Sequence, residues 1–157
     1  MLRHYLFVFF LSMVPLIELR GAIPIAVGLG VNPIRAIVVC AVGNLLPVPV
    51  IYFFARKFLN WGLDKRCISR ICHFFHDKGE RVGAKLSQKA GKVGLMVALA
   101  LFVGIPIPGT GAWTGTLGAS FLKMGIKETA LSVSAGVAIA AVIMTAVSLA
   151  GVHVFGL

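Results

Sequence analysis

Two long apolar tracts, residues 34–55 and 129–152, limit what this chain can fold into more than any other feature. Each has about the 20 residues that an α-helix needs to cross the hydrocarbon core of a bilayer. The composition agrees, because 59% of the residues are hydrophobic and soluble domains contain roughly 45–50%. We therefore expect an all-α integral membrane protein with a single membrane domain over residues 1–157.

The stretch Pro15–Pro24 places two charged residues, Glu18 and Arg20, between the apolar runs Tyr5–Met13 and Ile25–Val31. An ionisable side chain at membrane depth costs roughly 2.5–3.5 kcal/mol, so it usually faces a cavity and carries function. Proline and glycine disfavour a straight helix here. The pattern predicts a broken polar element with hinges at Pro15, Gly21 and Pro24.

The second half of the chain repeats this plan. Residues 93–122 form an apolar run, a break at 105–111 and a short run, and the tract 129–152 follows. With an offset of 90 residues, Gly21-Ala22 falls on Gly111-Ala112 and Gly28 on Gly118. We expect a first repeat over 1–55, a linker over 56–92 and a second repeat over 93–157. Each broken segment is either a re-entrant hairpin or one kinked span, and we favour the hairpin.

Positive charge is concentrated in the linker. The chain has 15 basic and 5 acidic residues, and ten of the basic ones lie between Arg56 and Lys92. Such clustering beside membrane segments is typical of cytoplasmic loops and argues against nucleic acid as the partner. Plotted as a helix, residues 63–77 separate into an apolar half containing Leu63 and Phe75 and a basic half, so we expect a cytoplasmic amphipathic helix in contact with membrane lipid.

Charge and the number of spans give a topology for a multi-pass protein of the inner (plasma) membrane. If the linker is cytoplasmic, the first hairpin enters from outside and the second from the cytoplasm, which makes the halves inverted repeats. Inverted repeats with broken helices that meet near the midplane are typical of secondary transporters.

Other chemistry finds little support in the sequence. Three cysteines, Cys40, Cys67 and Cys72, predict no disulfide. His73, His76 and Asp77 fit a solvated helix face better than a metal site. We find no catalytic triad, phosphate-binding loop or zinc pattern, and we expect neither an enzyme nor a cofactor.

The chain resembles a known family over nearly its whole length. The stretch Pro15–Pro24, the segment Gly43-Asn44 with Tyr52 and Arg56, and the motif from Ile107 to Trp113 with Gly118-Ala119 and Lys123-Met124 are similar to the small multidrug export proteins, relatives of the DedA superfamily. The resemblance implies two facing re-entrant hairpins, and for DedA relatives a proton-motive-force-dependent process or flipping of a lipid carrier. By position, Glu18 resembles the acidic residue of the first DedA hairpin.

Several residues are candidates for the site. Glu18 is the candidate proton acceptor and donor, with an ion pair to Arg20 as the structural alternative. Arg20 either binds an anionic headgroup or neutralises Glu18. Asn44 either lines the site or bonds another helix, and the glycines of the second break either line the site or serve packing. The predicted substrate-binding set is Arg20, Asn44, Pro106, Pro108, Gly109, Thr110, Gly111 and Trp113.

Together these features predict a proton-coupled or passive transporter of an amphipathic or lipid-linked substrate. A homodimer is expected, because two hairpins and two spans make a thin wall for a pathway. The alternative is a non-transporting membrane protein that recruits a partner or anionic lipid through its basic amphipathic helix.

Overall fold

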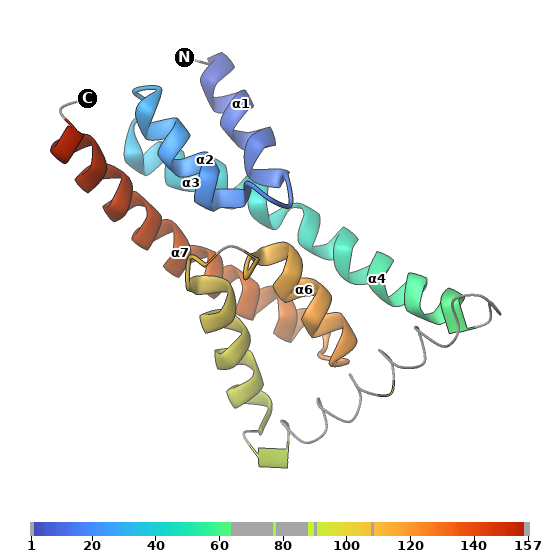
Figure 1. Cartoon of the computed structure of the whole chain (residues 1–157). Helices are drawn as coiled ribbons and strands as arrows, with labels where there is room; N and C mark the ends of the chain where they lie inside the picture. The colour runs from blue at the N-terminus through green and yellow to red at the C-terminus, as the bar shows by residue number, and fades with distance from the viewer. Residues whose placement is uncertain (1, 64–76, 78–87, 90, 108, 156–157) are drawn as a thin grey trace.

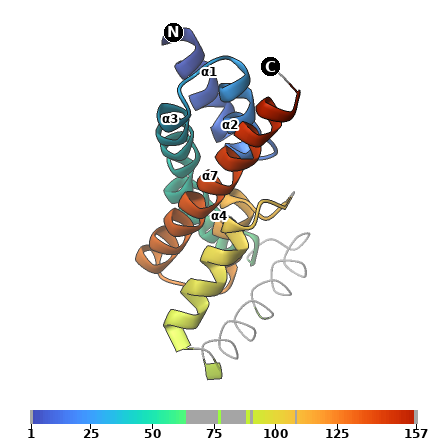
Figure 2. The same cartoon turned by 90° about the vertical axis from the view of Figure 1, so that its left-hand side faces the viewer.

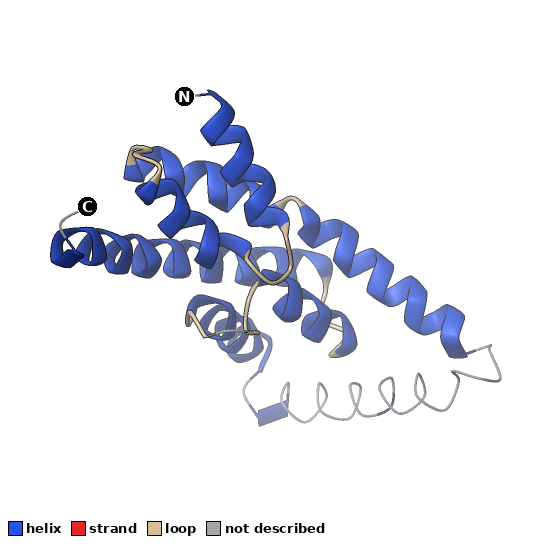
Figure 3. Cartoon of the chain, turned by 45° about the horizontal axis from the view of Figure 1, so that its top comes forward, coloured by secondary structure: helices blue, strands red, loops and turns tan. Residues whose placement is uncertain are grey.

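The computed structural model describes residues 2–63, 77, 88–89, 91–107 and 109–155 of the chain. Within these residues it contains helices joined by short turns and no strand (Figure 3). The described helices are α1 (Leu2–Met13), α2 (Glu18–Gly28), α3 (Pro33–Leu45), α4 (Pro47–Leu63), the Gly91–Gly104 helix, α6 (Ala112–Phe121) and α7 (Ile126–Phe155).

The first two helices form a hairpin, which we call the first hairpin. The turn between them covers only residues 14–17, with Pro15 exposed in it. The predicted break from Pro15 to Pro24 is therefore wrong in its extent, because the helix resumes at Glu18 and runs through Gly21 and Pro24. A proline inside a helix removes one backbone donor, and membrane helices tolerate this loss where neighbouring segments compensate for it.

The first long apolar tract forms α3 and α4. Asn32 caps α3, since its side-chain Oδ1 accepts hydrogen bonds from the backbone N–H groups of Ile34 at 3.1 Å and Arg35 at 3.4 Å, and Pro33 follows at the first helical position. The helix is interrupted at Leu46, where proline at the next residue disfavours helical geometry. The stretch Pro33–Phe58 is long and apolar enough to cross a membrane.

The second half contains another hairpin and another long helix. The Gly91–Gly104 helix, the loop that follows it and α6 make up what we call the second hairpin. The predicted break at 105–111 is confirmed for the described residues, and Pro108 lies outside them. The predicted second span is also confirmed, because Ile126–Gly151 of α7 is the second helix long and apolar enough to cross a membrane.

The two hairpins approach each other from opposite ends of the molecule. In Figure 1 the first hairpin occupies the end that holds both chain termini, and its turn points toward the middle. The second hairpin starts from the other end, and its loop also points toward the middle, while α7 passes both hairpins. Figure 2 shows the same arrangement after a quarter turn. The hairpin tips therefore meet at mid-height.

The second helices of the two hairpins share one pattern of burial. Four of the five buried positions in α2, Leu19, Ala22, Ile23 and Ala26, correspond at a constant spacing to four of the five in α6, Ala112, Gly115, Thr116 and Ala119. The spacing is three residues longer than the predicted offset of 90. The same spacing pairs Gly43 of α3 with Gly136 of α7. Gly43 lies against α1, and Gly136 lies against the Gly91–Gly104 helix, so each contacts the first helix of the hairpin in its half of the chain.

Side chains are distributed between the surface and the interior as expected for a protein exposed to lipid. Large apolar side chains are exposed on most helices, including Phe7, Phe10, Val50, Phe54 and Leu131. Small and polar side chains lie inside, where they allow close helix contacts and interhelical hydrogen bonds. The buried polar residues are Ser12, Glu18, Asn44, Thr116, Ser120, Thr129, Ser132, Thr145 and Ser148. This pattern fits a protein that lies in a membrane.

The predicted amphipathic helix lies almost entirely outside the described residues. Of its stretch, Leu63 is the end of α4 and Asp77 is described as exposed. Phe75, Cys67, Cys72, His73 and His76 belong to the part that the structure does not describe.

Candidate functional site

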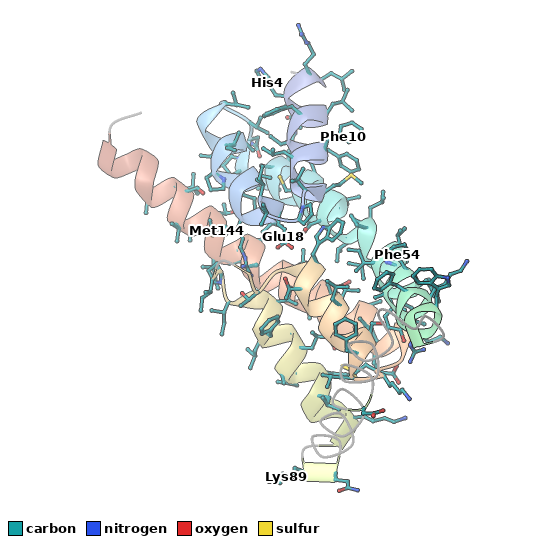
Figure 4. All side chains as sticks on the ribbon, turned by 45° about the vertical axis from the view of Figure 1, so that its right-hand side comes forward. His4, Phe10, Glu18, Phe54, Lys89 and Met144 are labelled. Atoms are coloured by element: carbon teal, nitrogen blue, oxygen red, sulfur yellow. The ribbon has the colours of Figure 1, made fainter. Side chains whose placement is uncertain are left out.

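The meeting point of the two hairpin tips brings together five of the predicted site residues. Figure 4 shows Glu18 between the two halves of the molecule. Arg20 follows it on α2, and the loop and first turn of the second hairpin contribute Thr110, Gly111 and Trp113. The hydrogen-bonded pairs Arg20–Thr110 and Glu18–Trp113 are 90 and 95 positions apart in the chain. We call these five residues the tip cluster.

Glu18 caps a helix of the opposite hairpin. Helix α6 begins after Gly111, which has no side chain to cap it. The carboxylate of Glu18 takes this role: its Oε1 accepts a hydrogen bond from the backbone N–H of Trp113 at 3.2 Å, and the N–H of Ala112 also bonds to it. The first amides of a helix lack partners and carry a partial positive charge, so a carboxylate is a favourable cap. Glu18 is only 5% exposed.

Gly111 leaves the space that this carboxylate occupies. A Cβ atom built on Gly111 would overlap the carboxyl group of Glu18. Any other residue would therefore push Glu18 away from the start of α6. This explains a glycine at the N-cap, where a side-chain oxygen would be the usual choice.

Arg20 ties α2 to the loop of the second hairpin. Its guanidinium donates to the carbonyl oxygens of Val103 at 3.3 Å and Ile105 at 3.0 Å, and also to that of Ile107. It donates to the hydroxyl of Thr110 at 2.9 Å as well. The carbonyls at the end of the Gly91–Gly104 helix carry a partial negative charge, which favours a cation. The planar guanidinium can reach several of these acceptors at once.

Thr110 holds the same loop together from within. Its hydroxyl contacts the carbonyl oxygens of Ile105 and Ile107, each at 2.9 Å. The guanidinium of Arg20 and this hydroxyl thus share the same acceptors. Gly109 beside it has φ at 88°, a left-handed conformation that glycine adopts without strain. The loop is fixed by side chains, although it has no regular secondary structure.

Trp113 makes the reverse contact, from the second hairpin to the first. Its indole Nε1 donates to the backbone carbonyl of Met13 at 3.1 Å, which is the last residue of α1. Each hairpin therefore satisfies unpaired backbone groups of the other. Trp113 belongs to the predicted substrate-binding set, and the structure places it half-buried in this exchange of caps.

The remaining predicted residues have different surroundings. Asn44 is buried in α3, and its side-chain Oδ1 has no hydrogen-bond partner within the described part of the chain. Pro106 is half-buried in the loop of the second hairpin. Gly21 lies inside α2, where an added Cβ would meet Ile17 Cγ2 at 2.5 Å.

Buried hydroxyls along α7 were missed by the sequence analysis. The hydroxyl oxygens of Thr129, Ser132 and Thr145 are buried, and none of the residues that the structure describes forms a hydrogen bond with them. Their spacing, with Ser148 three residues after Thr145, puts them on the buried side of α7. A search for hydroxyl residues at helical spacing within the apolar tract would have found them. Among the described residues, no three His, Cys, Asp or Glu side chains come together as a metal site would need.

Comparison with known proteins gives one match. A family model described as "Putative small multi-drug export protein" matches residues 18–143, from the first residue of α2 into the second half of α7. No curated protein and no solved structure matches the chain. The matched range contains the whole tip cluster and most of both long apolar helices, and the chain belongs to the small multi-drug export protein family that this model describes.

Proposed function

We propose that this protein is a proton-coupled membrane transporter in which the tip cluster is the gate and Glu18 is the group that binds the proton. The observation that carries the proposal is the exchange of caps between the hairpins, with a buried carboxylate at its centre. The family description and the apolar helices support transport in a membrane. A bond between two hairpins that depends on one charge is a suitable switch.

Protonation of Glu18 would weaken the contact between the hairpins. Hydrogen bonds to an ionised acceptor are roughly twice as strong as neutral ones, so the bonds from the amides at the start of α6 lose about half of their strength when the carboxylate takes a proton. The hydrogen bonds of Arg20 and Trp113 then hold the tips together without the charged cap, and the tips separate more easily. Loss of the proton restores the cap and closes the gate.

The same proposal includes the topology. Both hairpins are re-entrant, and the two halves are inverted repeats, with the basic segment 56–92 on the cytoplasmic side of the inner membrane. The common burial pattern of α2 and α6 and the opposite directions of the hairpins support this arrangement (Figure 1). The proposal also includes a relationship to the DedA superfamily, whose members the chain resembles in the residues of both hairpins. A homodimer would complete the wall around the pathway.

The substrate is an amphipathic or lipid-linked molecule. Open apolar surface lies next to polar groups at the tips, and both features suit such a molecule. When the tips separate, the guanidinium of Arg20 loses its carbonyl partners and becomes available to an anionic group. Asn44 Oδ1, which has no hydrogen-bond partner among the described residues, becomes a second polar contact for the substrate only if the change in the hairpins exposes this buried side chain.

Transport by reconstituted protein tests the proposal. The full chain in proteoliposomes should move ethidium, a cationic amphipathic dye, or a fluorescently labelled phosphatidylglycerol when a pH gradient is imposed. Glu18→Gln should abolish the gradient-driven movement, since it keeps the shape of the side chain and removes the titrating group. Glu128→Gln, which removes a carboxylate at the start of α7 instead, should leave movement intact.

Two further measurements separate loss of the titrating group from loss of the folded structure. Circular dichroism and gel filtration should show that Glu18→Gln remains folded, and Glu18→Asp should keep part of the activity because the carboxyl group is retained. Equal gradient-driven movement by the wild type and a folded Glu18→Gln protein would overturn the proposal.

A further inference from the structure

An apolar groove runs between the two helices of the second hairpin. It has a volume of about 350 Å³, within the roughly 300–1,000 Å³ of small-molecule pockets. Apolar and small residues line it almost throughout, and among the described lining residues only Thr114 carries a polar side-chain group. One wall is the Gly91–Gly104 helix, through Leu95, Leu99 and Phe102, and the other is α6.

Glycine keeps the α6 wall of the groove open. Gly118 lines the groove, and no atom of the described residues lies within 4 Å of the point where its Cβ would be. At Gly115, one turn earlier, a Cβ would meet Val103 at 2.5 Å, so that glycine serves close packing of the two helices. Gly118 therefore faces space that the described residues leave unfilled. An apolar groove of this kind on a membrane protein has the chemistry of an acyl-chain site.

Lysines mark one end of the groove. Lys92 precedes the lining residue Leu95 by about one helical turn, and Lys123 stands between the lining residues Leu122 and Met124. Lys127 lies in the first turn of α7, and Figure 4 places Lys89 at the same end of the molecule. All four are exposed. Glu128 lies among them and reaches back toward Gly125.

The conformation of Lys123 supports a role for its charge. Helices α2 and α6 end in the same way, with the backbone N–H of Val31 bonded to Ala26 O and that of Met124 to Ala119 O, each at 3.0 Å. This ending requires a left-handed residue, which is normally glycine. Helix α2 has Gly30 there, with φ at 72°, whereas α6 has Lys123 at 56°. The chain accepts backbone strain at this position and places a cation beside the groove.

We propose that this groove binds an anionic phospholipid, with an acyl chain between the Gly91–Gly104 helix and α6 and the phosphate headgroup at Lys92, Lys123 and Lys127. The lysines are complementary in charge to the phosphate headgroup, and the apolar lining is complementary to the acyl chain. Anionic lipids and basic segments meet at the cytoplasmic leaflet, where this end of the hairpin would lie. The site is separate from the tip cluster, and lipid binding there does not depend on transport.

Native mass spectrometry of the full chain in detergent, titrated with phosphatidylglycerol or phosphatidylcholine, tests the site. Wild type should prefer phosphatidylglycerol. Gly118→Leu should fill the groove and weaken phosphatidylglycerol binding at least about fivefold. Gly28→Leu is the matched control, because that position on α2 is equally open and lies outside the groove, and it should bind like wild type.

The lysines should control the choice of headgroup. The double variant Lys92→Gln, Lys127→Gln should lose about fivefold in phosphatidylglycerol affinity for each lysine, while phosphatidylcholine binding stays unchanged. Lys123→Gly should raise the melting temperature by relieving the left-handed strain and still weaken phosphatidylglycerol binding.

Several results would overturn the proposal. One is equal binding of phosphatidylglycerol by Gly118→Leu and wild type. Another is a loss of binding in Gly28→Leu as large as that in Gly118→Leu. A third is loss of a dimer in Gly118→Leu without loss of lipid, which would assign the groove to a second copy of the chain. Thermal melts confirm that each variant is folded.

Discussion

Glu18 adopts a backbone conformation that residues other than glycine seldom take, with φ at 49°. A left-handed residue with a Cβ costs roughly 1–2 kcal/mol, and this one also buries a carboxylate. The amides at the start of α6 offset that cost, because the unusual φ directs the side chain at them from the first residue of α2. Strain of this kind is typical of functional positions.

Gly111→Ala tests whether the cap by Glu18 depends on the absence of a side chain at the N-cap of α6. The added methyl group would overlap the Glu18 carboxylate, so we expect the cap to be lost and the protein to be destabilised by about 0.5–2 kcal/mol. Thermal unfolding in detergent measures the effect. Gly28→Ala, where an added Cβ meets nothing within 4 Å, is the control and should melt near the wild-type temperature.

Arg20→Lys tests the second contact between the hairpins. A lysine keeps the charge but has a single ammonium group, which cannot reach Val103, Ile105 and Thr110 together. We expect a melting temperature several degrees lower, since about 1–2 kcal/mol of charged hydrogen bonding is lost. Arg35→Lys, at the exposed start of α3, is the control and should change the melting temperature little. Equal melting temperatures for the two variants would show that the loop contacts contribute no stability.

The sequence selected the five residues that the structure brings together in the tip cluster, but not how they are paired. Two charges among apolar residues, and a loop rich in glycine and proline, were enough to select Glu18, Arg20 and Gly111. The partners of Glu18 and Arg20 are mainly backbone amides and carbonyls, and every residue type has these groups. Sequence patterns therefore cannot identify them until the fold brings the two hairpins together.

At the scale of helices, close packing depends on small residues where two helices cross. A Cβ on Gly136 of α7 would lie 2.6 Å from both Ala100 O and Val103 Cβ of the Gly91–Gly104 helix. Gly104 of that helix is similarly close to Ile139. These contacts hold α7 against the second hairpin. Gly43 has the same role between α3 and α1, where Phe9 O is 2.6 Å from its Cβ position.

Gly136→Ala should separate these two helices and destabilise the protein by about 1–3 kcal/mol, since the nearby backbone carbonyl cannot move easily. Gly151→Ala lies on the same helix with no atom within 4 Å of the added Cβ, and it should be neutral or slightly stabilising. Melting curves in one detergent allow the comparison. A neutral Gly136→Ala would contradict the close crossing.

Helix boundaries were predictable where they depend on local chemistry and less so elsewhere. Asparagine followed by proline is a local start signal for a helix, and α3 starts at Asn32-Pro33. Pro47 follows an interruption at Leu46. Pro24 was predicted to be a hinge and instead lies inside α2. Local propensity is a weak guide there, because packing of Leu19, Ala22, Ile23 and Ala26 holds α2 in place.

At the scale of the whole molecule, the proposed topology makes a prediction about accessibility. In a variant with serine at Cys40, Cys67 and Cys72, a new cysteine at Leu29 should react with a membrane-impermeant maleimide from outside the cell. A cysteine at Lys127 should react only after the membrane is opened. Reaction of positions 3 and 29 from opposite sides would mean that α1 and α2 together cross the membrane, which excludes the re-entrant hairpin.

The exchange of caps also has a consequence for how the protein is made. The ribosome completes the first hairpin long before it synthesises Gly111 and Trp113. During that interval the carboxylate of Glu18 lies in the bilayer without the backbone amides of α6 that cap it in the folded protein. We expect the first half, produced by itself, to be degraded rapidly. Coexpression of fragments separated between Asp77 and Gln88 should rescue both pieces, because each one completes the other after insertion.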